Sequence, residues 1–489
     1  MDTLIVVSNP ASWPFDTPGV ELVKAWDYLT NSAYFDRRGC KVFNLCRSYA
    51  YQSQGYYVSL LAEARGQRCL PTVATIQDLK STSIIRVASE DLDELIQKSL
   101  HHLKSDQFEI SIYFGRNLAH AYDALAQRIF NLYPAPLLRV YFSYKERWQL
   151  RNINLLSGND VPGSHRDFVA TVANDWFARR RMPGRKTGTS RFDLAILHDP
   201  NEAEPPSDSR ALERFVKAAR ALGVSTELIR KEDYGRIGEF DALFIRETTR
   251  VNHHTYRFAR RAYAEGLVVI DDPESILRCT NKVFLAELLA KKGISTPRTV
   301  ILHEQNVEEV GRELGFPVIL KRPDSAASQG VVKVADAEAL ITQAREFLND
   351  SDLLIAQEFV PTPFDWRIGI LDGVPLYACK YHMAHDHWQI INWTGSGGHR
   401  YGRVETLPVE IAPRRVVRTA LRAAKLIGDG LYGVDLKEVG SKCQVIEVND
   451  NPTIQSGCED RVLGDQLYDA ILGVFVRRME SRRQRHTPW

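Results

Sequence analysis

Short apolar segments alternate with amphipathic helical segments along this chain, most regularly in its middle. Residues 192–197, 242–245 and 267–270 are apolar enough for buried strands. Residues 209–222 and 255–265 carry a helical period, and each segment is followed at once by a glycine, the residue that most often ends a helix. Because parallel strands need long crossover connections, this order predicts a βαβαβ unit with a parallel sheet.

The chain has 489 residues, which is too long for one hydrophobic core. An extra N-terminal α/β domain is predicted where strand-like and helix-like segments alternate, at 4–7, 41–45, 91–104, 108–114, 118–130 and 137–142. A basic segment with Gly and Pro at 179–190 predicts a linker. We therefore expect an α/β protein of three domains, at 1–180, 191–277 and 278–489, and we find no internal repeat in the sequence.

The third domain is expected to be α+β, because several strands follow one another with few helices between them. The predicted helices are 281–292, 307–314, 336–349 and 413–427, and the predicted strands are 318–321, 331–334, 353–359, 366–371, 375–381, 389–392, 432–439 and 443–448. Asp372-Gly373 is a two-residue hairpin signal between two of these strands.

Composition excludes several classes of protein. The net charge of +2 gives no electrostatic reason to expect nucleic-acid or membrane binding, and no apolar run approaches the roughly 18 residues of a membrane span. The seven cysteines form no CxxC pair, which favours a reducing, cytoplasmic location over a disulfide framework or zinc ribbon. The first ten residues read as a strand rather than a signal peptide.

The strongest chemical signal lies in the last two predicted strands. Strand alternation puts Glu447 and Asn449 on one face, and Asp435 lies on the neighbouring strand. Two carboxylates and an amide oxygen make a hard oxygen site suited to Mg²⁺, which also binds nucleotide phosphates. The alternative is that these residues are solvated strand positions, but the rest of the strand is apolar.

Three weaker signals precede these strands. Lys321 ends an apolar strand, and the small-residue loop 324–330 after it can bring backbone N–H groups close to phosphate. Residues 357–360 end another strand before a proline and can offer backbone groups to an adenine edge. Arg367 and Lys380, on consecutive strands, can face one cleft and stabilise a transferring phosphoryl group. A surface salt bridge between Arg367 and Asp365 is an equally good reading of those residues alone.

These motifs, in this order and at these separations, resemble the ATP-grasp superfamily, and most closely its RimK-like carboxylate–amine ligases with an additional N-terminal domain. The resemblance covers about residues 281–473. It implies nucleotide contacts and phosphoryl-transfer residues. The implied nucleotide-binding residues are Lys282, Lys321, Ser328, Gln329, Gly330, Gln357, Glu358, Phe359, Val360 and Asp365. The implied catalytic residues are Arg367, Lys380 and Asn392, and the implied metal ligands are Asp435, Glu447 and Asn449. Relatives carry more glycines in the phosphate loop, where this chain keeps only Gly330.

The resemblance further implies a reaction. ATP and Mg²⁺, with Mn²⁺ as a substitute, would activate a carboxylate as an acyl phosphate, and an amine would displace the phosphate. The expected product is an amino acid, with glutamate the first candidate, joined to a peptide, protein or small-molecule partner. The alternative is an ATP-binding regulatory module that no longer ligates, with residues 1–180 as a protein-tethering module. A homo-oligomer is also expected. His382, His385 and His387 predict a substrate-facing loop more than a metal site.

Overall fold

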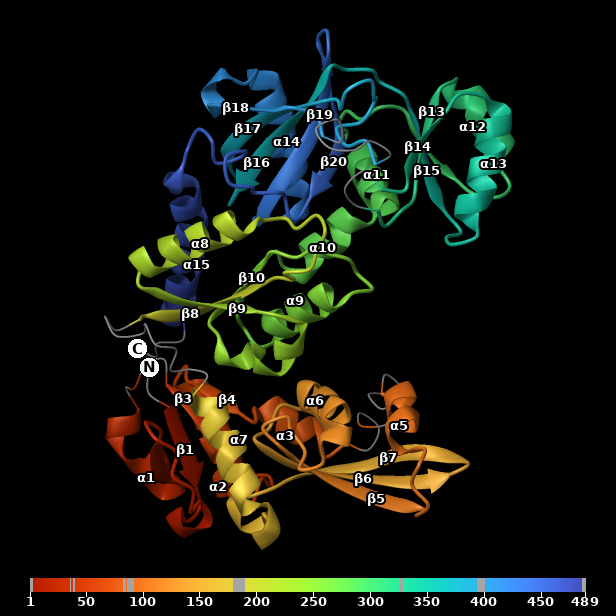
Figure 1. Cartoon of the computed structure of the whole chain (residues 1–489). Coiled ribbons are helices and arrows are strands. Elements are labelled where there is room, and N and C mark those ends of the chain that lie inside the picture. The colour runs from red at the N-terminus through yellow and green to blue at the C-terminus, as the bar shows by residue number, and fades with distance from the viewer. Residues whose placement is uncertain are drawn as a thin grey trace.

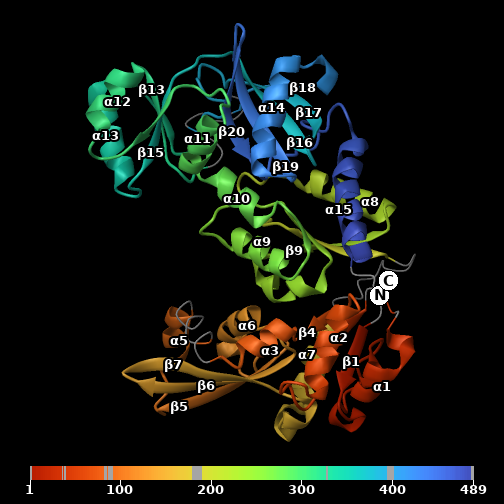
Figure 2. The same cartoon turned by 180° about the vertical axis from the view of Figure 1, so that it is seen from behind.

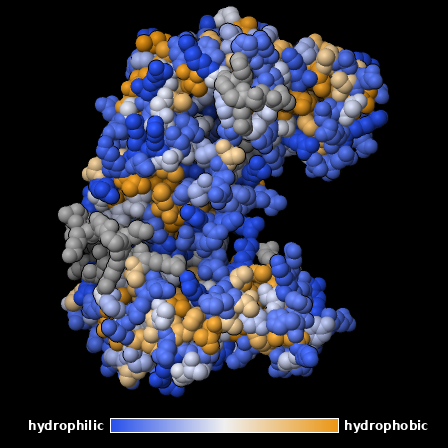
Figure 3. All heavy atoms as spheres, viewed as in Figure 1, coloured by the Kyte–Doolittle hydropathy of each residue, from blue (hydrophilic) through white to orange (hydrophobic). Residues whose placement is uncertain are grey.

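The computed structural model describes residues 3–35, 37, 40–81, 85, 92–178, 190–325, 329–393 and 401–485. Most of the predicted linker at 179–190 lies outside these residues. Strands in the described residues form five sheets, grouped in an N-terminal, a middle and a third part (Figure 1). A deep notch separates the N-terminal part from the third part on the face shown in Figure 3. Parallel and antiparallel sheets with covering helices confirm the predicted α/β class.

The N-terminal part contains two sheets. A parallel sheet has the order β2-β1-β3-β4, and an antiparallel sheet has the order β5-β6-β7. Their strands are β1 Thr3–Val7, β2 Glu21–Lys24, β3 Lys41–Asn44, β4 Arg68–Leu70, β5 Gln107–Tyr113, β6 Leu137–Lys145 and β7 Arg147–Leu155. The helices are α1 Ala25–Thr30, α2 Gln54–Ala64, α3 Val73–Asp78, α5 Asp93–Leu100, α6 Asp123–Leu132 and α7 Arg166–Ala178.

The middle part is one parallel sheet of order β11-β10-β8-β9 with helices on both faces. Its elements are β8 Phe192–Leu197, α8 Ser209–Ala221, β9 Val224–Ile229, β10 Ala242–Ile245, α9 His254–Ala264, β11 Val268–Ile270 and α10 Pro273–Thr280, with the 3₁₀ segment η6 Lys231–Glu239. Strand β9 escapes sequence prediction because its central residues are polar and half exposed. The last helix, α15 Asp465–Arg485, returns to pack on α8, where the rings of Tyr468 and Phe215 lie 4.7 Å apart.

The parallel sheet of the N-terminal part and that of the middle part have the same topology. The order β2-β1-β3-β4 corresponds strand for strand to β9-β8-β10-β11. Helix α2, strand β4 and helix α3 recur as α9, β11 and α10 at a constant offset of 200 residues. Within these segments, identical residues at this offset are few. They are the helix positions Tyr56 and Tyr256, Ala62 and Ala262, Ala64 and Ala264, and Ile76 and Ile276, and the glycines after the first helix of each copy, Gly66 and Gly266. The prediction that the chain has no repeat is therefore wrong, because the repeat survives in topology more than in sequence.

The two parallel sheets meet through the amino ends of their strands. Lys41, which begins β3, forms an ion pair of 3.1 Å with Asp193 of β8. Arg68, which begins β4, lies 3.9 Å from Asp241, just before β10. Because the strands within each sheet are parallel, this contact points the two carboxyl edges in opposite directions, and only the edge of the middle sheet faces the third part.

The third part has two antiparallel sheets. The smaller, of order β12-β15-β13-β14, is packed against α12 and α13, and the larger, of order β18-β17-β16-β19-β20, is covered on one face by α14 (Figure 2). The strands are β12 Thr299–Leu302, β13 Val318–Lys321, β14 Val331–Val334, β15 Leu354–Glu358, β16 Phe364–Leu371, β17 Val374–His382, β18 Val404–Leu407, β19 Leu431–Val439 and β20 Lys442–Asn449. The helices are α11 Lys282–Lys291, α12 Val307–Leu314, α13 Ala337–Leu348 and α14 Arg414–Ile427.

Two local predictions in the third part have opposite outcomes. The hairpin at Asp372-Gly373 is confirmed, with φ of +53° and +74°, as a two-residue turn of this kind requires. The strand predicted at 389–392 is wrong, because within the described residues this segment makes a single bridge, between Ile391 and Tyr401. Within the described part of the chain, no helix combines the length and apolarity needed to cross a membrane.

Candidate functional site

The three predicted metal ligands lie together on β19 and β20. Asp435 and Glu447 are direct cross-strand partners, and Asn449 lies two residues beyond Glu447 on the same face. Asn449 Nδ2 donates to Asp435 Oδ2 at 3.2 Å and to the Gly433 carbonyl at 3.2 Å. This orientation leaves the amide oxygen of Asn449 as a ligand, so two carboxylates and an amide form the hard oxygen set that Mg²⁺ prefers. Metal binding by these residues stays a prediction.

Both carboxylates have cationic neighbours. Arg367 on β16 donates to both oxygens of Asp435, at 2.6 and 2.7 Å, and Lys282 Nζ lies 2.9 Å from Glu447 Oε1. Burial raises the pKa of Asp435, and Arg367 opposes the shift. Burial acts in the same direction on Glu447, but Lys282 and Lys321 outweigh it and lower the pKa of Glu447. In this structure the carboxylates of the cleft are therefore paired with its cationic side chains. A bound metal ion could take over the carboxylates, and nucleotide phosphates could take over the cations.

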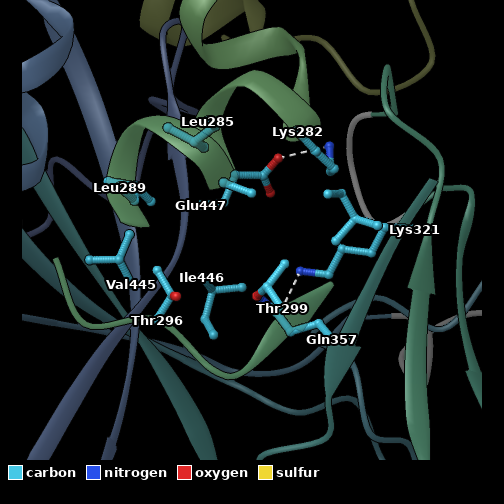
Figure 4. A pocket seen from close by; sticks show the side chains of 12 residues that line it. Lys282, Leu285, Leu289, Thr296, Thr299, Lys321, Gln357, Val445, Ile446 and Glu447 are labelled. Atoms are coloured by element: carbon cyan, nitrogen blue, oxygen red, sulfur yellow. Dashed lines mark hydrogen bonds and ion pairs between the residues drawn. The ribbon is translucent and has the colours of Figure 1, made fainter. Parts of the chain in front are cut away.

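Lys282 and Lys321 point into one narrow pocket between the two sheets of the third part (Figure 4). Lys282 begins α11 and Lys321 ends β13, and each is less than a tenth exposed. Lys282 Nζ also donates to the Ser325 carbonyl, and Lys321 Nζ donates to Gln357 Oε1 at 2.8 Å. Burial lowers the pKa of Lys321 to about 8, with Lys282 adding to the shift and Glu447 opposing it. Two lysines from distant segments thus share one site.

The other predicted nucleotide contacts are less complete. Ser328 lies outside the described residues, whereas Gln329 and Gly330 form a turn in which the Gly330 carbonyl accepts from Arg322 N–H at 2.9 Å. Gln357 is engaged at both ends, because its Nε2 donates to Thr299 Oγ1 at 2.9 Å.

The predicted adenine hinge begins at the end of β15. The Glu358 side chain pairs with Arg298 at 2.8 Å, and its N–H donates to the Arg298 carbonyl at 2.9 Å. An adenine contact at this hinge therefore falls to the Glu358 carbonyl or to the backbone of Phe359 and Val360. That contact stays a prediction.

The prediction that Lys380 shares a cleft with Arg367 is wrong. Arg367 pairs with Cys379, and Lys380 pairs with Trp366 on the opposite face. A bulge between Gly369 and Ile370 shifts the hairpin register by one residue, and such a shift moves a side chain to the other face. Lys380 lies over the Phe364 and Trp366 rings, at 5.2 and 5.4 Å, and His382 is on that same face, away from the cleft.

Tyr381 and Lys437 lie in the cleft, and the sequence analysis did not predict either of them as a site residue. The Arg367 guanidinium lies 4.8 Å from the centre of the Tyr381 ring. Lys437, two residues after Asp435 on the same strand face, forms an ion pair of 2.5 Å with Asp365. The alternative prediction, a surface salt bridge between Arg367 and Asp365, is thus wrong, since each side chain has another partner. Strand alternation from Asp435 was the signal that points to Lys437.

A second cavity, of about 450 Å³, lies between the middle part and the third part. From the third part it is lined by Arg367, Tyr381, Glu447 and Asn449, among others, and from the middle part by Glu204, Pro205, Pro206, Thr248, Thr249 and Arg250. Its size is typical of a small-molecule site. Asn392 is not among the described lining residues, although Ile390 and Ile391 are. The carboxyl edge of the middle sheet therefore supplies one wall of the cavity.

Arg246 joins the two walls of this cavity from beneath. It is 1% exposed, and it donates to Asn451 Oδ1 at 2.6 Å and to the carbonyls of Pro206 and Pro452 at 2.7 and 2.8 Å. Burial lowers its pKa to about 10, which still leaves it charged near neutral pH. A buried arginine that donates hydrogen bonds to both the middle part and the third part helps to fix their relative position beside the cavity.

Comparison with known proteins agrees with this geometry. The family described as RimK-like ATP-grasp N-terminal domain matches residues 25–172. The alpha-aminoadipate–LysW ligase LysX of Saccharolobus solfataricus is 29% identical over 195 residues, 38% of this chain and 67% of the relative. A probable alpha-L-glutamate ligase of Vibrio vulnificus is 26% identical over 221 residues, 44% of this chain and 70% of the relative. These matches support the predicted resemblance to RimK-like ATP-grasp ligases.

Solved structures similar to this chain include D-alanine–D-alanine ligase from Bacillus anthracis, with a TM-score of 0.47, 16% identity and coverage of 60% of this chain and 99% of that one. A RimK domain ATP-grasp protein from Sphaerobacter thermophilus gives a TM-score of 0.44, 18% identity and coverage of 57% and 98%. The predicted enzyme class, a ligase that forms carbon–nitrogen bonds, is confirmed by the sequence relatives, and these findings do not support the regulatory alternative.

Proposed function

We propose that this chain is a RimK-like ligase that uses ATP to join an amino acid, with glutamate the first candidate, to a peptide, protein or small-molecule partner. The observation that carries the proposal is the convergence of Lys282, Lys321 and Arg367 on the carboxylates Asp435 and Glu447. These residues come from five separate elements and meet beside a cavity of small-molecule size. The names of the sequence relatives, which include glutamate and alpha-aminoadipate ligases, support an amino-acid substrate.

The nucleotide is proposed to bind between the two sheets of the third part. Lys282 and Lys321 would neutralise phosphate charge there, since both ammonium groups point into that pocket. Mg²⁺, or Mn²⁺ in its place, would be held by Asp435, Glu447 and Asn449 and would supply further positive charge to the phosphates when bound. Glu447 borders both cavities, so we expect the phosphates to lie at their junction.

The reaction is proposed to occur at that junction. A substrate carboxylate oxygen attacks the γ-phosphorus, the bond to the β-phosphate oxygen breaks, and ADP leaves. The amine of the second substrate then attacks the acyl carbon, phosphate leaves, and the amine loses a proton. Arg367 lies where it can stabilise the transferring phosphoryl group, and no nucleophilic side chain is needed. Arg250, exposed in the cavity wall, can bind a substrate carboxylate.

One experiment tests this function directly. The protein is incubated with ATP, Mg²⁺ and mixtures of amino acids and short peptides, and mass spectrometry and ADP release are followed together. We expect a condensed product that appears with stoichiometric ADP. ADP release without any condensed product across these mixtures would contradict the ligase proposal.

The N-terminal part is proposed to tether a protein substrate. The cavity is lined, among the described residues, only from Glu204 onward, so the N-terminal part adds no wall to it. Its contact with the amino edge of the middle sheet holds it away from the chemistry. Lys41→Glu would set two carboxylates against each other at Asp193 and loosen this attachment. It should reduce ligation to a protein substrate and leave ligation to small amines intact. Equal loss for both substrates would contradict tethering.

A further inference from the structure

The carboxyl edge of the middle sheet has a crevice between β8 and β10. From β8 the chain runs first to β9 on one side and later to β10 on the other. In parallel sheets, ligands bind outside the carboxyl ends of the strands at such a switch point. His198 follows β8 here, and Glu247 follows β10 with one residue between. The crevice therefore carries ionisable side chains that the ligase chemistry proposed above does not use.

Three side chains at this edge converge. Ligand atoms of Glu247, His253 and His254 all lie within 4.8 Å of one another. His253 and His254 sit at the start of α9, with ring centres 3.9 Å apart, and the Glu247 side chain is only 5% exposed. One buried carboxylate and two imidazoles thus offer three potential metal-ligand atoms, from a loop and from the start of a helix.

His254 and Glu247 form a close pair, with His254 Nε2 2.5 Å from Glu247 Oε1. The fold thus holds an imidazole and a carboxylate, both of them metal-ligand groups, side by side. Glu247 is held in place from the third part, because its carbonyl accepts from Asn451 Nδ2 at 2.7 Å.

We propose that Glu247, His253 and His254 bind a divalent transition-metal ion, with Zn²⁺ the best fit. Two imidazole nitrogens and one carboxylate suit Zn²⁺, whereas Mg²⁺ prefers oxygen ligands alone. Three protein ligands leave a fourth position open, as in zinc sites that contact a substrate. Thr248, Thr249 and Arg250 follow Glu247 directly and line the cavity, so the ion fixes this segment of its wall.

The test uses the full chain without ATP. The protein is stripped with a chelator, dialysed against Zn²⁺ and then against buffer, and its metal content is measured by mass spectrometry. We expect one equivalent of Zn²⁺ in the native protein, and Co²⁺ in its place should give the visible absorption of a tetrahedral site. Absence of stoichiometric Zn²⁺ from the native protein would overturn the proposal.

Variants locate the site and separate it from the predicted Mg²⁺ site. His253→Ala and Glu247→Gln should each weaken Zn²⁺ binding at least ~10-fold, as changes at a metal site commonly do. His253 makes no side-chain cap to α9, so the first variant should keep its fold, as circular dichroism can check. His385→Ala, at an exposed histidine paired with Asp386, and Glu447→Gln should retain Zn²⁺. Binding that is unchanged in both site variants would also overturn the proposal.

Discussion

The N-terminal and middle parallel sheets share a topology but differ at their carboxyl edges. The middle edge opens on a cavity and carries charged side chains, including Glu247 and Arg250. The N-terminal edge is covered, because Trp13 after β1 is 2% exposed and packs in one core with Leu156 and Val161. Gly158 lies so close that a side chain there would meet the Ser12 carbonyl. The same framework thus gives an open site in one copy and a sealed edge in the other.

The largest expected effect lies at the open site. Glu447→Gln should lower Mg²⁺-dependent ADP release and ligation by roughly 100- to 1000-fold, because it removes one charge from the predicted metal set. Initial rates at saturating ATP measure this, with Glu410→Gln, at a residue outside both cavities, as the matched control. Turnover like that of the native enzyme would remove Glu447 from the mechanism.

A change at the sealed edge should affect stability and leave chemistry alone. Trp13→Ala removes a buried ring and should cost about 3–5 kcal/mol of the free energy of unfolding of the N-terminal part. Denaturant unfolding measures this, while kcat on small substrates stays at the native value. Trp26→Ala, at a ring that is 55% exposed, serves as control and should change little. A large fall in kcat for the Trp13 variant would show that the sealed edge takes part in catalysis.

At the open edge, Arg250→Ala should raise the KM of a carboxylate substrate about tenfold or more, with kcat nearly unchanged, since a charge-assisted hydrogen bond is lost. Arg260→Ala, which removes an exposed arginine of α9 that is not among the cavity-lining residues, is the control. An unchanged KM for every carboxylate substrate would show that the open edge does not bind that substrate.

A graded effect concerns pH. Burial is the main cause that lowers the pKa of Lys321 to about 8, and the positive charges of Lys282 and Lys437 lower it further. The carboxylates of Glu447 and Asp365 offset this shift only in part. The ammonium charge is present below this pH and lost above it. We therefore expect kcat/KM for ATP to fall as pH rises through about 8, approaching roughly tenfold per pH unit. A flat profile to pH 10 would contradict a role for this charge.

The Lys321→Arg variant sharpens the same measurement. Arginine stays protonated across this range, so the variant should lack the fall even if its overall rate is lower. An identical fall in both proteins would assign the titration to another group.

Sequence patterns predicted most strands and helices because their burial is periodic. The set Asp435, Glu447 and Asn449 was placed together correctly, since alternation fixes which residues of a strand share a face. Lys380 was misplaced because its face depends on one bulge, which no side-chain pattern marks. Arg246 was missed because the partners of a buried arginine lie on segments some 200 residues away, and local sequence carries no sign of them.

The repeat was missed for a related reason. Parallel-sheet cores accept many apolar side chains, so duplicated sheets keep their strand order after most identities are lost. The cluster of Glu247, His253 and His254 was equally invisible, because it depends on a loop and a helix start meeting at one crevice. Contacts within one strand or helix are thus readable from sequence, and contacts between segments are mostly not.

Helix α15 has a consequence for synthesis of the chain. Its Tyr468 and Phe475 pack on Phe215 and Phe244 and so complete the core of the middle sheet. During translation the N-terminal part can fold early, since domains generally fold as they emerge. One face of the middle sheet, by contrast, stays only partly covered until α15 has left the ribosome.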